Sequence, residues 1–83
     1  MRYSFPAIFE QDSVDMEAIN VVFPDIIGAV TFGIGYTEAM EMAKDLLLGL
    51  LEQEKIRNIK PTPIEKVSTE FGKVMLVEVE YHV

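Results

Sequence analysis

One amphipathic segment in the middle of the chain constrains the fold more than any other feature. Apolar residues recur between Tyr36 and Leu51 at the i, i+3, i+4 and i+7 spacing of one helix face. Gly35 is the expected N-cap, and Glu38 lies near the positive end of the helix dipole. The expected apolar face consists of Tyr36, Ala39, Met40, Ala43, Leu47, Leu50 and Leu51. Such a helix needs a second layer against which it buries this face.

Four strand-like segments are available to form that layer. Each alternates between apolar and polar positions or is rich in β-branched and aromatic residues, as half-buried strands are. The four segments are residues 3–10, 18–23, 29–32 and 73–83. Pro6 lacks a backbone N–H, so its N–H side cannot lie within a continuous ladder. The pattern leaves residues 64–72 unassigned.

The element order β-β-β-α-β predicts a single α+β domain that spans residues 1–83. Three strands joined by short connections form an antiparallel meander, so the first and third strands point the same way. The helix then returns the chain to a fourth strand, and a right-handed crossover places it parallel beside the first. We therefore expect a four-stranded mixed sheet with one main helix packed on one face.

The uneven charge distribution argues against several classes of partner. The net charge is −7, and residues 1–54 hold ten acids against only Arg2 and Lys44. Phosphate-binding surfaces need clustered Lys and Arg, so we expect no direct nucleic-acid binding. No apolar stretch approaches the ~20 residues of a membrane span, and no signal peptide is evident. The absence of cysteine fits a reducing cytoplasm. The acidic first half favours a basic partner, with solubility alone as the alternative.

No residue pattern supports catalysis, a metal site or a cofactor site. The acids between residues 10 and 17 lack the glycine and the spacing of a calcium loop, which favours a solvated turn. His82 has no partner for a metal site or a nucleophilic mechanism. Residues 33–35 lack the third glycine and the lysine of a phosphate loop. We therefore expect no enzymatic activity, no metal ion and no cofactor.

A motif that begins at Phe23 resembles the HicB family of antitoxins. HicB sequences carry a run of the form F-P-D-L-P-G-x-x-T-x-G, and this chain has FPDIIGAVTFG in its place. Residues 61–63 resemble the family's I-P-x-P loop. The chain departs from the family at Ile27, where a proline is usual, and at residues 34–35, where Asp-Thr is usual. Further matches are Tyr3, Pro6, Ala7, Phe9, Glu38, Ala39 and Ala43, and the motif turn consists of Phe23, Pro24, Asp25, Gly28, Thr31 and Gly33.

The resemblance implies a fold like a partly degraded RNase H and a role without catalysis. RNase H-type enzymes hold two metal ions with carboxylates, one of them in the first strand, and residues 3–9 contain none. The family's usual partner is a HicA-type toxin, a small basic RNA-cleaving protein that the antitoxin covers. Two-part HicB proteins carry a DNA-binding segment after the last strand. Because this sequence stops at Val83, we expect a stand-alone domain or one without that segment.

Two functional hypotheses follow from these observations. In the first, the chain neutralises a HicA-like toxin, and its candidate partner-binding residues are Glu10, Asp12, Asp15 and Asp25. For Asp25, capping or bracing its own turn is the favoured role, and contact with a partner is the second. In the second hypothesis, the chain is an orphan HicB-like domain with an unknown ligand. It then forms a homodimer or higher homo-oligomer through Leu46 and Leu48, which extend the apolar surface around the helix.

Overall fold

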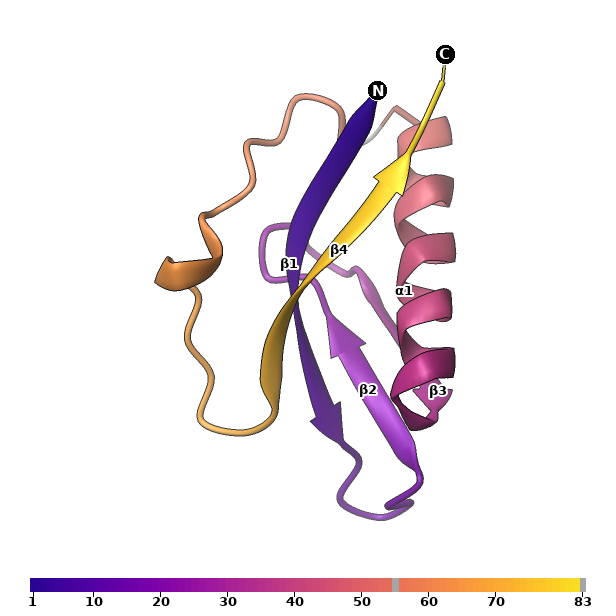
Figure 1. Cartoon of the computed structure of the whole chain (residues 1–83), viewed down its shortest axis with the longest axis vertical. Coiled ribbons are helices and arrows are strands. Elements are labelled where there is room, and N and C mark those ends of the chain that lie inside the picture. The colour runs from indigo at the N-terminus through magenta and orange to yellow at the C-terminus, as the bar shows by residue number, and fades with distance from the viewer. Residues whose placement is uncertain (55, 83) are drawn as a thin grey trace.

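The computed structural model describes residues 1–54 and 56–82 and confirms the expected order of elements (Figure 1). The strands are β1 (Arg2–Gln11), β2 (Ala18–Val22), β3 (Val30–Ile34) and β4 (Lys73–Glu80). The helices are α1 (Gly35–Glu52) and the short 3-10 helix η1 (Ile64–Lys66), which falls in the stretch that the sequence pattern left unassigned. Val83, the expected end of the last strand, lies outside the described residues.

The sheet is antiparallel throughout, so the expected mixed sheet is wrong. Its strand order is β3-β2-β1-β4, and β4 pairs antiparallel with β1 from Arg2↔Glu80 to Phe9↔Lys73. The helix does carry the chain back to the end where β1 begins. From there, the connection between α1 and β4 runs along the whole sheet to its other end before β4 starts (Figure 1). This long connection reverses the direction that a short crossover would have given the last strand.

Pro6 lies where β1 has a neighbour on one side only. Backbone bonds between Tyr81 N–H and the Met1 carbonyl, and between Asp12 N–H and the Ala18 carbonyl, fix the alternation along β1. Odd-numbered residues of β1 bond to β4, whereas even-numbered residues face β2. Pairing with β2 begins only at Ile8, so the missing N–H of Pro6 faces no strand. This confirms that a continuous ladder is absent on that side of Pro6.

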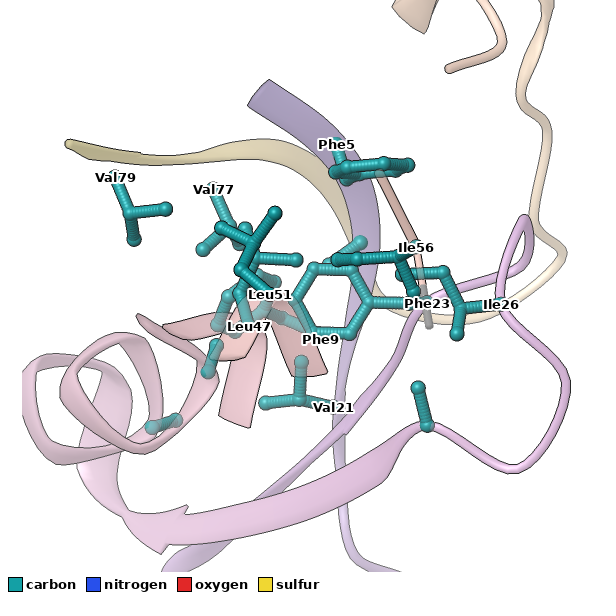
Figure 2. Close-up of a cluster of buried hydrophobic side chains, with 14 of the residues drawn as sticks. Phe5, Phe9, Val21, Phe23, Ile26, Leu47, Leu51, Ile56, Val77 and Val79 are labelled. Carbon is teal, nitrogen blue, oxygen red and sulfur yellow. The ribbon is translucent and has the colours of Figure 1, made fainter. Parts of the chain in front are cut away.

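The core lies between α1 and one face of the sheet (Figure 2). The helix contributes the buried residues Ala39, Ala43, Leu47 and Leu51. The strands contribute Phe5, Ala7, Phe9, Ile19, Val21, Val77 and Val79. Because Ala39 and Ala43 are small, the backbone of α1 lies close to the strands. Phe23 and Ile56 close one end of the core. Tyr36, the first residue of the expected apolar face, lies at its margin and is 41 % exposed.

The start of α1 differs from the expected Gly35 N-cap. Ile34 is the N-cap residue, and its backbone N–H donates to Oε1 of Glu38 at 2.9 Å. The strand β3 extends through Gly33 to Ile34, and α1 follows without an intervening loop. A Cβ on Gly33 would meet the backbone of Ala39, so glycine at this position permits the close approach of helix and strand.

Alanine substitutions at two glycines should have opposite effects on stability. Gly33→Ala should destabilise the fold by about 1–3 kcal/mol or more, because backbone atoms cannot move aside as a flexible side chain can. Gly49→Ala should stabilise it by about 1 kcal/mol, since Gly49 lies within α1 and a Cβ there meets nothing within 4 Å. Urea unfolding of both variants provides the measurement. Equal effects of the two substitutions would contradict the close contact at Gly33.

Candidate protein-binding surface

The face of the sheet that α1 does not cover carries a group of apolar side chains. Successive residues in a strand point to opposite faces. Because Val21 and Phe9 point into the core, the even-numbered residues of the first three strands point away from α1. The strand register places Val30 beside Val22, and Phe32 beside Asn20 in the next row. Apolar side chains of neighbouring strands thus lie together on this open face.

Five large apolar side chains on the open face are 41–62 % exposed. These residues, here called the apolar patch, are Val22, Val30, Phe32, Ile34 and Leu76. The connection between α1 and β4 passes on the same side of the sheet (Figure 1), where Pro6 is buried. The exposed apolar surface therefore lies mainly over β2 and β3. A group of exposed apolar side chains of this kind is typical of a protein-binding surface.

The turn between β1 and β2 brings carboxylates next to the apolar patch. Glu10 pairs with Asn20, and Asn20 pairs with Phe32, so these three residues form one row across the open face. Asp12 accepts a hydrogen bond from Nδ2 of Asn20 at 2.8 Å. The acidic hairpin, as we call it, consists of Glu10, Asp12, Asp15 and Glu17. It gives the apolar patch an acidic border.

Two of the candidate partner-binding acids hold the hairpin turn together. Asp12 Oδ2 accepts the backbone N–H groups of Val14 at 3.0 Å and Asp15 at 2.8 Å. Asp15 Oδ1 accepts the N–H of Glu17 at 3.1 Å. Within the described residues, the carboxylates of Glu10 and Glu17 make no hydrogen bond or ion pair. The carboxylates of Glu10 and Glu17 can therefore accept hydrogen bonds or form ion pairs with an external partner.

Asp25 braces a distant segment of the chain. Its Oδ2 accepts the backbone N–H of Thr62 at 2.8 Å, and its Oδ1 accepts the Thr62 hydroxyl at 2.6 Å. Asp25 belongs to the motif turn, whereas Thr62 lies between the two prolines of the connection. The two hydrogen bonds therefore join the motif turn to residues 61–63, the two loops that resemble the family. They hold the connection between α1 and β4 in place shortly after the end of α1. The sequence pattern gave no sign of this pairing.

The other motif residues also have structural roles. Phe23 is buried, and its backbone N–H donates to the Ala29 carbonyl at 3.0 Å, which closes the turn. Gly28 has a φ of 81°, a conformation that favours glycine. Thr31 pairs with Val21 across the β2–β3 ladder. Pro24 is exposed at the start of the turn. The motif residues thus determine the shape of the turn and of β3. They affect the open face indirectly, because β3 forms part of it.

The remaining sequence-derived candidates lie outside this surface. Leu46 and Leu48 are partly buried against the core and offer less apolar surface than the open face does. His82 is exposed beyond the end of β4. In residues 1–54 and 56–82, no three or more His, Cys, Asp or Glu side chains gather where they could hold a metal ion. Among the same residues, no helix is long and apolar enough to cross a membrane.

The hydrogen bonds to Asp12 predict a pH dependence of stability. They lower the pKa of Asp12 below 3.8, through the N–H of Asp15 first, then the Asn20 amide and the Val14 N–H. Because the folded state has the lower pKa, ionised Asp12 contributes stability above the unfolded-state value of about 3.9. This contribution is lost as the pH falls through the folded-state pKa. The stability difference between wild type and Asp12→Ala should therefore shrink between about pH 6 and about pH 3.

Urea unfolding at the two pH values checks this prediction. Asp45→Ala on the exposed side of α1 serves as the control, because the structure shows no hydrogen bond to that carboxylate within the described residues. A stability difference for Asp12→Ala that stays constant across the range would contradict the role of the ionised carboxylate in the turn.

Comparison with known proteins relates this fold to antitoxins. No family model and no curated protein sequence matches the chain. A chain of a toxin–antitoxin complex from Streptococcus pneumoniae matches with a TM-score of 0.76 and 26 % identity, over 96 % of this chain and 70 % of that one. The N-terminal domain of the antitoxin HicB from Burkholderia pseudomallei matches with a TM-score of 0.66 and 18 % identity, over 98 % of this chain and 100 % of that one. The fold of this chain is therefore that of a HicB-like antitoxin domain.

Proposed function

We propose that this domain is a non-catalytic antitoxin module that neutralises a HicA-like, RNA-cleaving toxin in the cytoplasm by binding it directly. The observation that carries the proposal is the apolar patch with its acidic border on the open face of the sheet. Apolar contacts at the centre of an interface supply most of the affinity, and charges at its rim mainly raise the association rate. Such a surface fits a small basic protein that presents apolar side chains of its own.

The similarity to a chain of a toxin–antitoxin complex supports the same role. The charge distribution agrees with it, because residues 1–54 have a net charge of −8 and attract a basic partner. The same charge disfavours nucleic acid as the direct ligand. A catalytic role lacks support, since β1 contains no carboxylate between Tyr3 and Phe9 that could hold a metal ion.

The acidic hairpin should control how fast the toxin is captured. Glu10→Gln combined with Glu17→Gln should slow association with the toxin and flatten its dependence on salt. Salt shortens the Debye length from ~10 Å at 0.1 M to ~3 Å at 1 M, so the wild-type rate should fall over that range. Stopped-flow or surface-binding kinetics with a small basic HicA-like protein from the same host gives the rates. These two acids are chosen because they have no structural partner in the described residues, unlike Asp12.

A matched control carries the same change in net charge on the opposite side of the molecule. Glu41→Gln combined with Asp45→Asn alters the exposed side of α1 and should leave the association rate close to that of the wild type. In the same samples, the wild-type domain should suppress cleavage of RNA by the toxin at equimolar concentration. Continued cleavage in the presence of excess domain would contradict the antitoxin function, whatever the kinetics show.

A further inference from the structure

The strand β3 forms one edge of the sheet, and this edge lacks the usual protection against pairing. In the order β3-β2-β1-β4, β3 has a neighbour on one side only. Natural edge strands avoid further pairing through lysines, prolines, bulges or a covering segment. Residues 30–34 (VTFGI) contain neither charge nor proline. Two of their side chains, Val30 and Phe32, are 62 % and 57 % exposed.

Backbone hydrogen bonds show which groups of β3 point outward. Phe23 N–H bonds to the Ala29 carbonyl and Gly35 N–H to the Glu17 carbonyl, so the odd-numbered residues of β3 bond to β2. The N–H and C=O groups of Val30, Phe32 and Ile34 therefore point away from the sheet. Glu38 accepts the Ile34 N–H, which closes that end of the edge. The open part of the edge consists of the donors and acceptors of Val30 and Phe32.

The side chains around this edge are apolar on both faces of the sheet. Val30 and Phe32 belong to the open face. On the other face, Met42 and Leu46 follow Glu38 at intervals of four residues, so all three lie on the same side of α1. Glu38 reaches the backbone of Ile34, which places this side of the helix along the β3 edge. Met42 is 41 % exposed there.

Charge indicates which partner this edge accepts. Residues 26–37 form the longest stretch without a charged side chain in a chain of net charge −7. A basic partner is drawn to the carboxylates of the acidic hairpin rather than to this neutral edge. Two copies of the acidic chain, by contrast, repel each other least where carboxylates are sparse, and the Glu38 carboxylate at the end of this edge is already bound to the Ile34 N–H. The neutral edge therefore fits a second copy of this chain.

We propose that two copies of this chain pair antiparallel through β3 and form one continuous eight-stranded sheet. The two-fold axis passes beside Thr31, so that Val30 of one copy pairs with Phe32 of the other. This register uses the open donors and acceptors of both copies in four hydrogen bonds. A shift by two residues in one direction would require the Ile34 N–H, which Glu38 already holds. A shift in the other direction would require Gly28, whose φ of 81° is not extended.

A single cysteine tests the register directly, because the chain contains no cysteine of its own. In the proposed dimer, Thr31 faces Thr31 of the other copy as a non-hydrogen-bonded pair, with Cα atoms about 4.5 Å apart. This distance lies within the range of about 4.4–6.8 Å that a disulfide spans. Thr31→Cys should therefore form a covalent dimer under mild oxidation, seen on a non-reducing gel. Val30→Cys lies two residues out of register and should cross-link much less.

Sedimentation of the protein alone tests the edge without any toxin present. At micromolar concentration, the wild type should have twice the 9.4 kDa mass of one chain. Val30→Pro removes an outward N–H that no bond among residues 1–54 and 56–82 uses, so it should yield a folded monomer. Val30→Ala, which keeps the N–H, should remain a dimer. Phe32→Lys places a lysine on the edge and should also yield a monomer.

Three results would overturn the proposal. They are a monomeric wild type, a dimer that both Val30→Pro and Phe32→Lys leave intact, and cross-linking of Thr31→Cys no greater than that of Val30→Cys. If circular dichroism shows that Val30→Pro does not fold, Phe32→Lys and Thr31→Cys still decide the question. The toxin is absent from all these measurements, so their outcome is independent of the proposed antitoxin function.

Discussion

The close contact between α1 and one face of the sheet determines the rest of this molecule. Gly33 and Ala39 allow the helix backbone to approach the strands, and Leu47 and Leu51 fill the space beside them. The described part of the chain forms a single long helix, so only one face of the sheet is fully covered. The connection between α1 and β4 passes over the second face (Figure 1), where the apolar side chains over β2 and β3 stay exposed. The exposed apolar patch is a direct consequence of this arrangement.

The local pattern of the sequence was sufficient to predict the elements but not the direction of the last strand. Helical periodicity and strand alternation act over a few residues, and both α1 and the four strands were found in this way. The direction of β4 depends on the path of the long connection. That path is fixed in part by the pairing of Asp25 with Thr62, which are 37 positions apart. No short-range pattern reveals such a contact.

The candidate site was predicted only in part. The acidic hairpin was identified from charge, but which carboxylates are committed to the turn depends on geometry, as at Asp12. The apolar patch was not predicted, because the excess of leucines in α1 is the stronger apolar signal in the sequence. A signal was present, since Val30, Phe32 and Ile34 alternate on β3, whose other face carries only the smaller residues Thr31 and Gly33. When a strand has small residues on its core face and large apolar residues on its outer face, this pattern favours a contact of the outer face with another protein.

The central claim is that the open face of the sheet binds the toxin, and a pair of matched substitutions tests it most directly. Val22 lies in the apolar patch on β2 and not on the β3 edge, whereas Ile27 is fully exposed in the motif turn and lies outside the patch. Val22→Asp should raise the Kd for a HicA-like toxin by about tenfold or more, which corresponds to about 1.4 kcal/mol. Ile27→Asp, with the same change in charge, should leave the Kd within about twofold, a difference well below 1 kcal/mol. Equal Kd values for the two variants, measured by titration calorimetry, would contradict binding through the open face.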